Sequence, residues 1–176
     1  MKIFSTVAVR NTRIKKGKAI DMDLFEKRTA AGIVVYDVLT QSYLMGNRAD
    51  GQGWGFAAGK QEKSDVTIYQ TAIRELKEEF GVVLTAEQEK SIDFVKTILC
   101  QYDKIDREGK NLGTRHIFSN TYLLKVYGRD SIRFDESLKD DEATEVKWLS
   151  MAEICSEKVI FPPSLIALNV CRFSDY

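Results

Sequence analysis

Apolar residues along this chain form several strand-like runs and one longer stretch with helical spacing. In that stretch, Tyr69 to Phe80, apolar side chains recur at spacings of three and four, so they share one face of a helix. Gly81 follows directly and supplies a helix stop. Runs of β-branched and aromatic residues predict strands over residues 2–10, 28–37, 42–48, 82–84, 92–102, 116–126 and 144–149.

Shorter helices are predicted where capping signals occur. These signals are Thr85 with Gln88, Ser150 with Glu153, and Ser164 as the N-cap of a last helix over residues 165–171. The polar stretch 103–114, with two glycines, is predicted to be a hairpin connection or a mobile flap. Gly32 interrupts the apolar run 28–37, which predicts a buried strand that another backbone approaches closely.

Mixed strands, one long central helix and a C-terminal helix predict an α+β fold with helices packed on a mixed sheet. The chain has 176 residues, of which 44% are hydrophobic. This length and composition suit a single globular domain over residues 1–176. Residues 1–27 are expected to form an N-terminal β extension of that domain.

Charge and cysteine content exclude several classes of function. The 26 basic and 26 acidic residues cancel, so no overall field recruits nucleic acid or an anionic membrane. Three cysteines without paired spacing argue against a disulfide framework or a zinc site, and they fit a reducing, cytoplasmic location. No apolar run at the start is long enough for a signal peptide or a membrane span. Binding must therefore come from a local site.

The central helix carries the strongest candidate chemistry. Glu75, Glu78 and Glu79 fall within an arc of roughly 100°, beside the apolar face. Each like-charged pair at these spacings costs about 0.2–0.5 kcal/mol, and only Arg74, four residues before Glu78, offers local relief. Three hard oxygen donors on one turn suit Mg²⁺ or Mn²⁺. The alternative is a solvated acidic helix face without a bound metal.

The stretch from Gly59 to Val82 resembles a Nudix box, the signature of hydrolases that act on nucleoside diphosphates linked to another group. The positions that match in residue type are Gly59, Arg74, Glu75, Leu76, Glu78, Glu79, Gly81 and Val82. Asp65 stands where the family has Glu, and one extra residue separates it from Arg74. Ala57 and Ala58 replace the Pro and Gly that often precede the box glycine.

This resemblance implies a Nudix α/β/α sandwich and a metal-dependent pyrophosphohydrolase in which water attacks phosphorus. By the same resemblance, Glu75, Glu78 and Glu79 hold Mg²⁺ or Mn²⁺, and the Gly59 carbonyl lies near the metal. One of the glutamates accepts a proton from water, and the sequence does not say which. A further catalytic carboxylate is expected just before the strand 144–149, with Glu142 as first choice and Glu145 as second. The alternative is an exposed acidic loop.

Three residues are candidates for binding the substrate near the glycine loop, namely Arg48, Trp54 and Lys60. They would hold phosphate or stack on a base, although Trp54 in the core is the better interpretation. His116 is the only histidine, and a structural role is favoured for it. Asp65 and Arg74 are expected to form a partly buried ion pair that supports the metal ligands, with Glu62 as a competing partner.

Two other functions share this resemblance. The altered front of the box would suit a Nudix-fold module that binds or senses a nucleotide without cutting it. An RNA-cap hydrolase would need an RNA-binding surface, which the neutral charge does not supply. The expected partner is a small-molecule nucleotide of unspecified identity. The sequence leaves the oligomeric state open, with a homodimer as one alternative.

Overall fold

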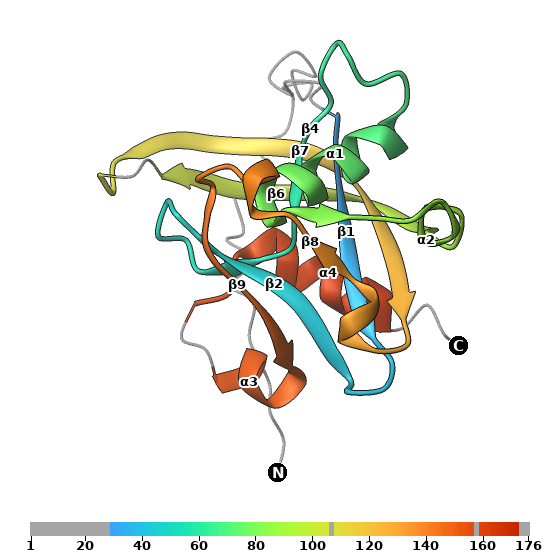
Figure 1. Cartoon of the computed structure of the whole chain (residues 1–176). Helices are drawn as coiled ribbons and strands as arrows, with labels where there is room; N and C mark the ends of the chain where they lie inside the picture. Colours follow the sequence, from blue (N-terminus) through green and yellow to red (C-terminus); the bar gives the residue numbers. More distant parts are fainter. Residues whose placement is uncertain (1–28, 106–107, 157–158, 173–176) are drawn as a thin grey trace.

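The computed structural model describes residues 29–105, 108–156 and 159–172 (Figure 1). The β extension predicted for residues 1–27 lies outside these ranges. Within them, no helix is both long and apolar enough to cross a membrane.

A mixed sheet forms the centre of the described structure (Figure 1). Its strands run in the order β3-β2-β1-β7-β6, and β4 and β9 pair with β1 and β2. The β1/β7 pair is parallel over its whole length, whereas the other pairs in this sheet are antiparallel. The strands are β1 (Thr29–Asp37), β2 (Ser42–Arg48), β3 (Trp54–Gly55), β4 (Ala58–Lys60), β6 (Asp93–Ile105), β7 (Asn111–Val126) and β9 (Ala143–Ser150).

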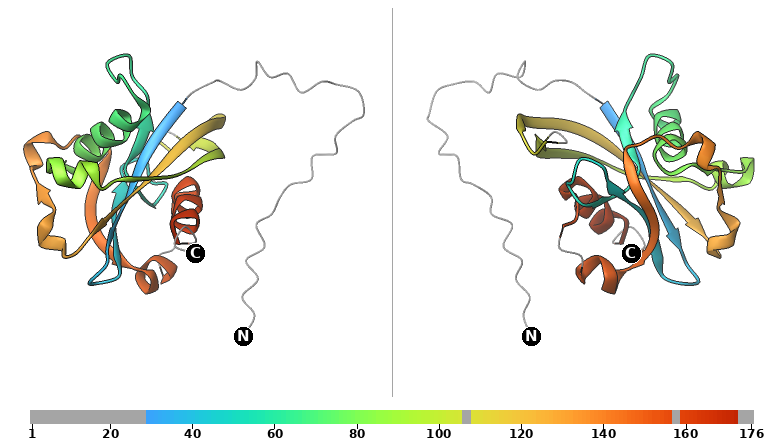
Figure 2. Two further views of the ribbon diagram at one scale, coloured as in Figure 1. Left: turned by 90° about the vertical axis from the view of Figure 1, so that its right-hand side faces the viewer. Right: turned by 60° about the vertical axis from the view of Figure 1, so that its left-hand side comes forward.

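Helices cover both faces of this sheet, with α1 (Ile68–Phe80) on one side and α4 (Pro162–Arg172) on the other (Figure 2). Successive side chains of a strand point to opposite faces. Ala31, Ile33 and Val35 therefore belong to the core beneath α1, whereas Val34 belongs to the core beneath α4. The predicted α/β/α sandwich is confirmed.

The central helix begins and ends at sequence signals. Thr67 caps α1 through a capping box with Gln70, and Gly81 ends it with a left-handed φ of 68°. Ala72, Leu76 and Phe80 are buried, as the helical spacing predicts. Smaller elements complete the chain, namely β5 (Val82–Val83), α2 (Ala86–Lys90), β8 (Arg133–Phe134), α3 (Met151–Ser156) and the short 3₁₀ turns Arg129–Ser131 and Glu136–Leu138.

Gly32 on β1 pairs with Ala58, the first residue of β4. A Cβ atom there would lie 2.5 Å from the Ala58 Cβ and 2.6 Å from the Ala57 carbonyl oxygen. The close backbone approach predicted at this glycine is confirmed, and it brings Gly59 under the central helix.

Two predictions about connections need correction. The stretch 103–114 does contain the hairpin connection between β6 and β7, but the connection is shorter than predicted, because β6 continues to Ile105 and β7 already begins at Asn111. Cross-strand pairing of the long hairpin extends both strands beyond the point where the apolar pattern fades. Ser164 lies inside α4 rather than at its N-cap, and its buried hydroxyl accepts a hydrogen bond from the Phe56 backbone N–H at 3.0 Å.

The C-terminal segment is joined to the loop that precedes β4. The Trp54 backbone N–H donates to the Val159 carbonyl, and the Phe161 N–H donates to the Trp54 carbonyl. Together with the Ser164 hydrogen bond, these contacts fix the start of α4 against β3. Segments about 100 residues apart in the sequence therefore lie side by side.

Candidate active site

A cavity of about 340 Å³ opens between the loop after β2, strand β4, helix α1 and the start of α4. This volume lies in the range of small-molecule sites. Its wall includes the acidic residues Asp50, Glu62, Glu75 and Glu142 and the basic residues Arg48 and Lys60. Strands β6 and β7 also contribute to the lining, through Cys100, His116 and Ser119.

Glu75 lies against the backbone of Gly59 at this cavity. A Cβ atom at position 59 would lie 2.2 Å from both the Cδ and an oxygen of the Glu75 carboxylate. Only a glycine therefore leaves room for the carboxylate here. One turn further along α1, the buried Glu79 carboxylate accepts a hydrogen bond from the Ala58 N–H at 3.3 Å.

The electrostatic state of these carboxyl groups reflects burial and crowding. Burial raises the pKa of Glu75 to about 7, with Glu78 and Glu142 adding repulsion and Arg74 opposing it. Burial raises the pKa of Glu79 well above its ordinary value, with further repulsion from Glu75 and Glu142. Glu75, Glu79 and Glu142 thus form one interacting acidic group.

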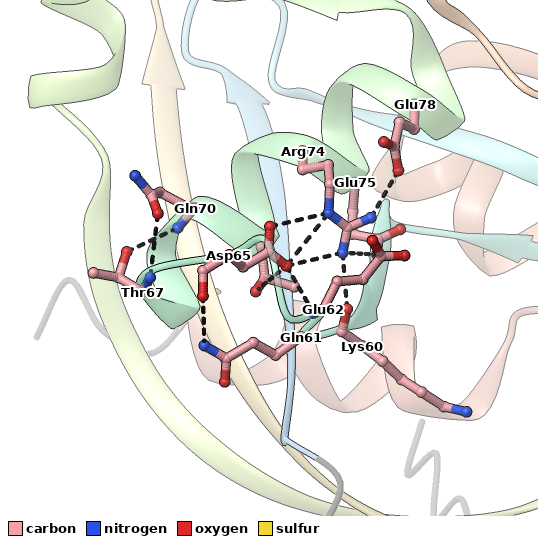
Figure 3. A network of polar contacts seen from close by, with 10 residues as sticks. Lys60, Gln61, Glu62, Asp65, Thr67, Gln70, Arg74, Glu75 and Glu78 are labelled. Carbon is pink, nitrogen blue, oxygen red and sulfur yellow. Dashed lines mark hydrogen bonds and ion pairs between the residues drawn. The ribbon is translucent and has the colours of Figure 1, made fainter.

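Arg74 is the centre of an ionic network at the front of α1 (Figure 3). Its Nη2 lies 3.1 Å from Asp65 and 2.8 Å from Glu75, and its Nη1 lies 2.7 Å from Glu78. Nη2 also donates to the Lys60 carbonyl at 2.8 Å. One guanidinium therefore connects the loop before α1, strand β4 and two box glutamates.

The expected contact between Asp65 and Arg74 is present. The Asp65 side chain is only 5% exposed and also accepts hydrogen bonds from the Thr71 hydroxyl and the Glu62 N–H. Hydrogen bonds from Arg74 lower the Asp65 pKa, although burial opposes this. Glu62, the competing partner, contributes its backbone to this arrangement, and its side chain lies on the cavity wall.

The other predicted acidic residues occupy different positions. The Glu78 side chain is 45% exposed and paired with Arg74, and it does not line the cavity. Glu142, just before β9, lines the cavity and acts electrostatically on Glu75 and Glu79. Glu145 instead pairs with Lys147 at 2.6 Å.

The three predicted substrate-binding residues differ in whether they line the cavity. Arg48 and Lys60 both line the cavity. Trp54 does not: it is 8% exposed and belongs to the core cluster that includes Phe56 and Leu168. The expectation that Trp54 binds substrate is corrected in favour of the core interpretation, since its backbone pairing with the C-terminal segment fixes it inside.

The donor set fits a divalent cation on two grounds. Hard carboxylate oxygens gather beside a glycine backbone that leaves no room for a side chain, and their mutual repulsion would be relieved by positive charge. As arranged, no three carboxyl, thiol or imidazole groups among the described residues form a complete metal site. Arg74 engages oxygens of Glu75 and Glu78.

A family model described as NUDIX domain matches residues 26–167. The chain belongs to the Nudix family. Membership of this family supports a Nudix-type pyrophosphohydrolase. A search of curated proteins found no match. A single domain over residues 1–176 stays a prediction.

Solved structures share the Nudix fold with this chain. A bifunctional NMN adenylyltransferase/ADP ribose pyrophosphatase from Francisella tularensis is 21% identical, with a TM-score of 0.61 over 84% of this chain. The match spans only 41% of that longer protein. The NUDIX domain of Shewanella oneidensis NrtR, complexed with ADP ribose, is 19% identical, with a TM-score of 0.60 over 92% of each chain. A C. elegans Ap4A hydrolase is 20% identical, with a TM-score of 0.52 over 84% of this chain and 96% of that one.

Sequence reasoning missed several residues of the cavity wall. Asp50 and Gln52 lie in the loop after β2, and Phe161 and Pro163 lie at the start of α4. An acidic residue two positions after Arg48 and an aromatic residue before two prolines are weak signals that many unrelated loops share. Only the pairing of residues 159–161 with β3 brings the two segments together.

We expect the Asp65–Arg74 contact to stabilise the fold by a measurable coupling. Both side chains are largely shielded from solvent, so removing one partner leaves a poorly solvated charge. A double-mutant cycle of Asp65→Asn and Arg74→Gln, followed by urea unfolding, should give a coupling free energy between about 0.5 and 3 kcal/mol. A smaller coupling, together with unchanged metal affinity in both single variants, would contradict the supporting role.

Proposed function

We propose that this protein is a metal-dependent hydrolase that cleaves a diphosphate linkage in a nucleoside diphosphate derivative, with water attacking phosphorus. The observation that carries this proposal is that Glu75 and Glu142 line one cavity together with Gly59, while the buried Glu79 interacts electrostatically with both carboxylates. Membership of the Nudix family supports the same reaction class.

The charge on the cavity wall supports metal dependence. Among the described residues, four carboxyl groups line the cavity, but only Arg48 and Lys60 supply full positive charges, and Asp50 pairs with Arg48. A diphosphate is itself an anion, so this wall would repel it without a neutralising cation. Mg²⁺ or Mn²⁺ fits this task, because both favour oxygen ligands.

We assign roles to the residues as follows. Glu75 and Glu79, with the Gly59 carbonyl, would hold the metal, and Glu78 stays a predicted donor although Arg74 engages it in the structure. When bound, the metal would neutralise phosphate oxygens and lower the pKa of a bound water. Glu142, which lies on the same wall, is suited to accept the proton from the attacking water.

Lys60 and Asp65 complete the proposed machinery. Lys60 lies on the cavity wall next to Gly59, where its ammonium group suits an anionic phosphate. Asp65 and Arg74 position the loop and the first turns of α1. The Arg74 guanidinium also pairs with Glu75 and Glu78 and so offsets part of their mutual repulsion.

A second candidate is a nucleotide-binding module that has lost hydrolysis. The engagement of Glu75 and Glu78 by Arg74 favours it, because these oxygens would have to exchange partners to bind a metal. The similarity to a NUDIX domain complexed with ADP ribose is compatible with either candidate. The two differ in whether a bound nucleotide is cut.

We expect at least one nucleoside diphosphate derivative to be cleaved, and excess EDTA to abolish the cleavage. The assay is a panel of nucleoside triphosphates, ADP-ribose, dinucleotide polyphosphates and capped RNA with Mg²⁺ or Mn²⁺, resolved by product mass. Full turnover in EDTA would remove the metal mechanism. Binding of a panel member without cleavage under any of these metals would favour the non-hydrolytic module.

Replacing Glu79 by Gln should lower kcat by roughly 10²-fold or more, the scale of losing a key electrostatic contact. Gln keeps the size and the acceptor for the Ala58 N–H but removes the charge. Circular dichroism should show an intact fold. Full activity of Glu79→Gln on every cleaved substrate would show that the metal lies elsewhere.

Glu142 and Glu145 offer a matched pair of variants in one segment. Glu142→Gln should lower kcat by at least about tenfold, because Glu142 lies on the cavity wall. Glu145→Gln should change kcat by less than about threefold, or 0.7 kcal/mol, because Glu145 pairs with Lys147 outside the cavity. Equal, small effects of both substitutions would assign Glu142 to a solvated loop.

A further inference from the structure

Arg48 and Asp50 form a two-point ion pair on the cavity wall. The Arg48 Nε donates to one Asp50 carboxylate oxygen at 3.0 Å, and Nη2 donates to the other. Gln52 adds two more donors, its backbone N–H at 3.1 Å and its side-chain amide at 3.0 Å. Such a forked contact fixes the planar guanidinium relative to the carboxylate.

The Phe161 ring contacts the Arg48 guanidinium of this pair. The Arg48 Cζ lies 4.3 Å from the centroid of the Phe161 ring, the distance of a stacked cation–π contact. Phe161 is only 9% exposed, and its backbone N–H donates to the Trp54 carbonyl. The ring is therefore fixed by the fold, and the guanidinium lies on a rigid base.

The pair carries little net charge. Burial of Asp50 opposes ionisation, but the hydrogen bonds and charge of Arg48 and the donors of Gln52 hold its pKa below the ordinary value. Asp50 is thus ionised at neutral pH and compensates Arg48. A compensated guanidinium attracts phosphate weakly, whereas its flat face suits stacking on an aromatic ring.

The same cavity also contains the proposed catalytic carboxylates. Arg48, Asp50 and Phe161 line it together with Glu75 and Glu142. We propose that the Arg48–Asp50 pair, backed by Phe161, is the platform on which the nucleobase of the substrate stacks. This inference rests on the proposed function, in that the substrate is a nucleotide derivative, and it assigns Arg48 to the base rather than to a phosphate.

Binding to this platform depends on whether the ligand has a base more than on which base it has. Stacking uses the π-face that every base has, and purines offer a larger face than pyrimidines. The substrate class that fits is therefore a nucleoside diphosphate derivative. A base on the side of the guanidinium opposite Phe161 would form a third layer of the stack, with its phosphates toward Glu75 and Lys60.

The test compares AMP with ribose 5-phosphate, which carries a hydroxyl where AMP has its base, by calorimetric titration of the full chain with Mg²⁺. The unaltered protein should bind AMP at least about tenfold more tightly, the scale of one stacked base. Arg48→Lys keeps the charge but loses the planar fork, and Phe161→Leu keeps an apolar side chain but loses the ring. Each should remove most of the preference for AMP while changing ribose 5-phosphate affinity by less than about threefold.

Asp50→Asn provides a separate check, since it removes the compensating charge and leaves the Arg48 and Phe161 side chains unchanged. It should weaken the preference for AMP and strengthen binding of ribose 5-phosphate, because Arg48 then becomes an uncompensated cation. Circular dichroism and thermal unfolding identify any variant that fails to fold. Any one folded variant among the three is sufficient to decide between a base platform and a phosphate contact.

Two results would overturn the platform. One is equal affinity of the unaltered protein for AMP and ribose 5-phosphate, including no measurable binding of either. The other is an equal loss of affinity for both compounds in Arg48→Lys, which would make Arg48 a phosphate ligand. Cleavage of a diphosphate with either result would leave the hydrolase proposal standing. A preference for AMP that depends on Arg48, without cleavage of any panel compound, would support the platform and contradict the hydrolase.

Discussion

The candidate site depends on the close approach of strand β4 to helix α1, which is possible because Gly59 has no side chain. A Cβ atom there would occupy the position of the Glu75 carboxylate. The position of β4 depends in turn on β1, where Gly32 lets Ala57 and Ala58 lie almost in contact with its backbone. Two glycines in different strands thus set the distance between a backbone and a helical row of glutamates, and that distance brings the carboxylates to the cavity.

The second constraint is electrostatic, since several like charges must coexist around this contact. Arg74 balances these negative charges, because its single planar guanidinium contacts Asp65, Glu75 and Glu78. Its additional hydrogen bond to the Lys60 carbonyl ties the charge balance to the position of β4. Asp65 is shorter than the glutamate usual in the family, and the extra residue before Arg74 accompanies a loop in which the contact is still made. The two departures from the box pattern are therefore compatible with an intact ionic network.

The far wall of the cavity depends on the C-terminal segment. The segment 159–161 pairs with β3, and the Ser164 hydroxyl accepts from the Phe56 backbone, so α4 is joined to the loop before the box. Phe161 reaches Arg48 through this arrangement. One side of the site is therefore built by the family signature, and another side is built by a distant segment. Phe56 and Ser164, which join the two, are 108 positions apart in the sequence.

The sequence by itself determined the central helix, its end at Gly81, the acidic row on its surface, the close approach at Gly32 and the family. These are local properties, because helical spacing, capping residues and glycine positions act within a few residues. It also gave the correct partner for Arg74, since the box pattern places an acidic residue in the preceding loop. Trp54 and Ser164 show the limit. An aromatic residue beside a glycine loop suits a ligand as well as a core, and a serine after two prolines suits a helix cap. Only the tertiary structure decided these two cases. It also decided that Glu142 lines the cavity whereas Glu145 pairs with Lys147, and that Arg48 contacts Phe161. Each of these outcomes depends on which backbone or charged group the fold places beside the side chain.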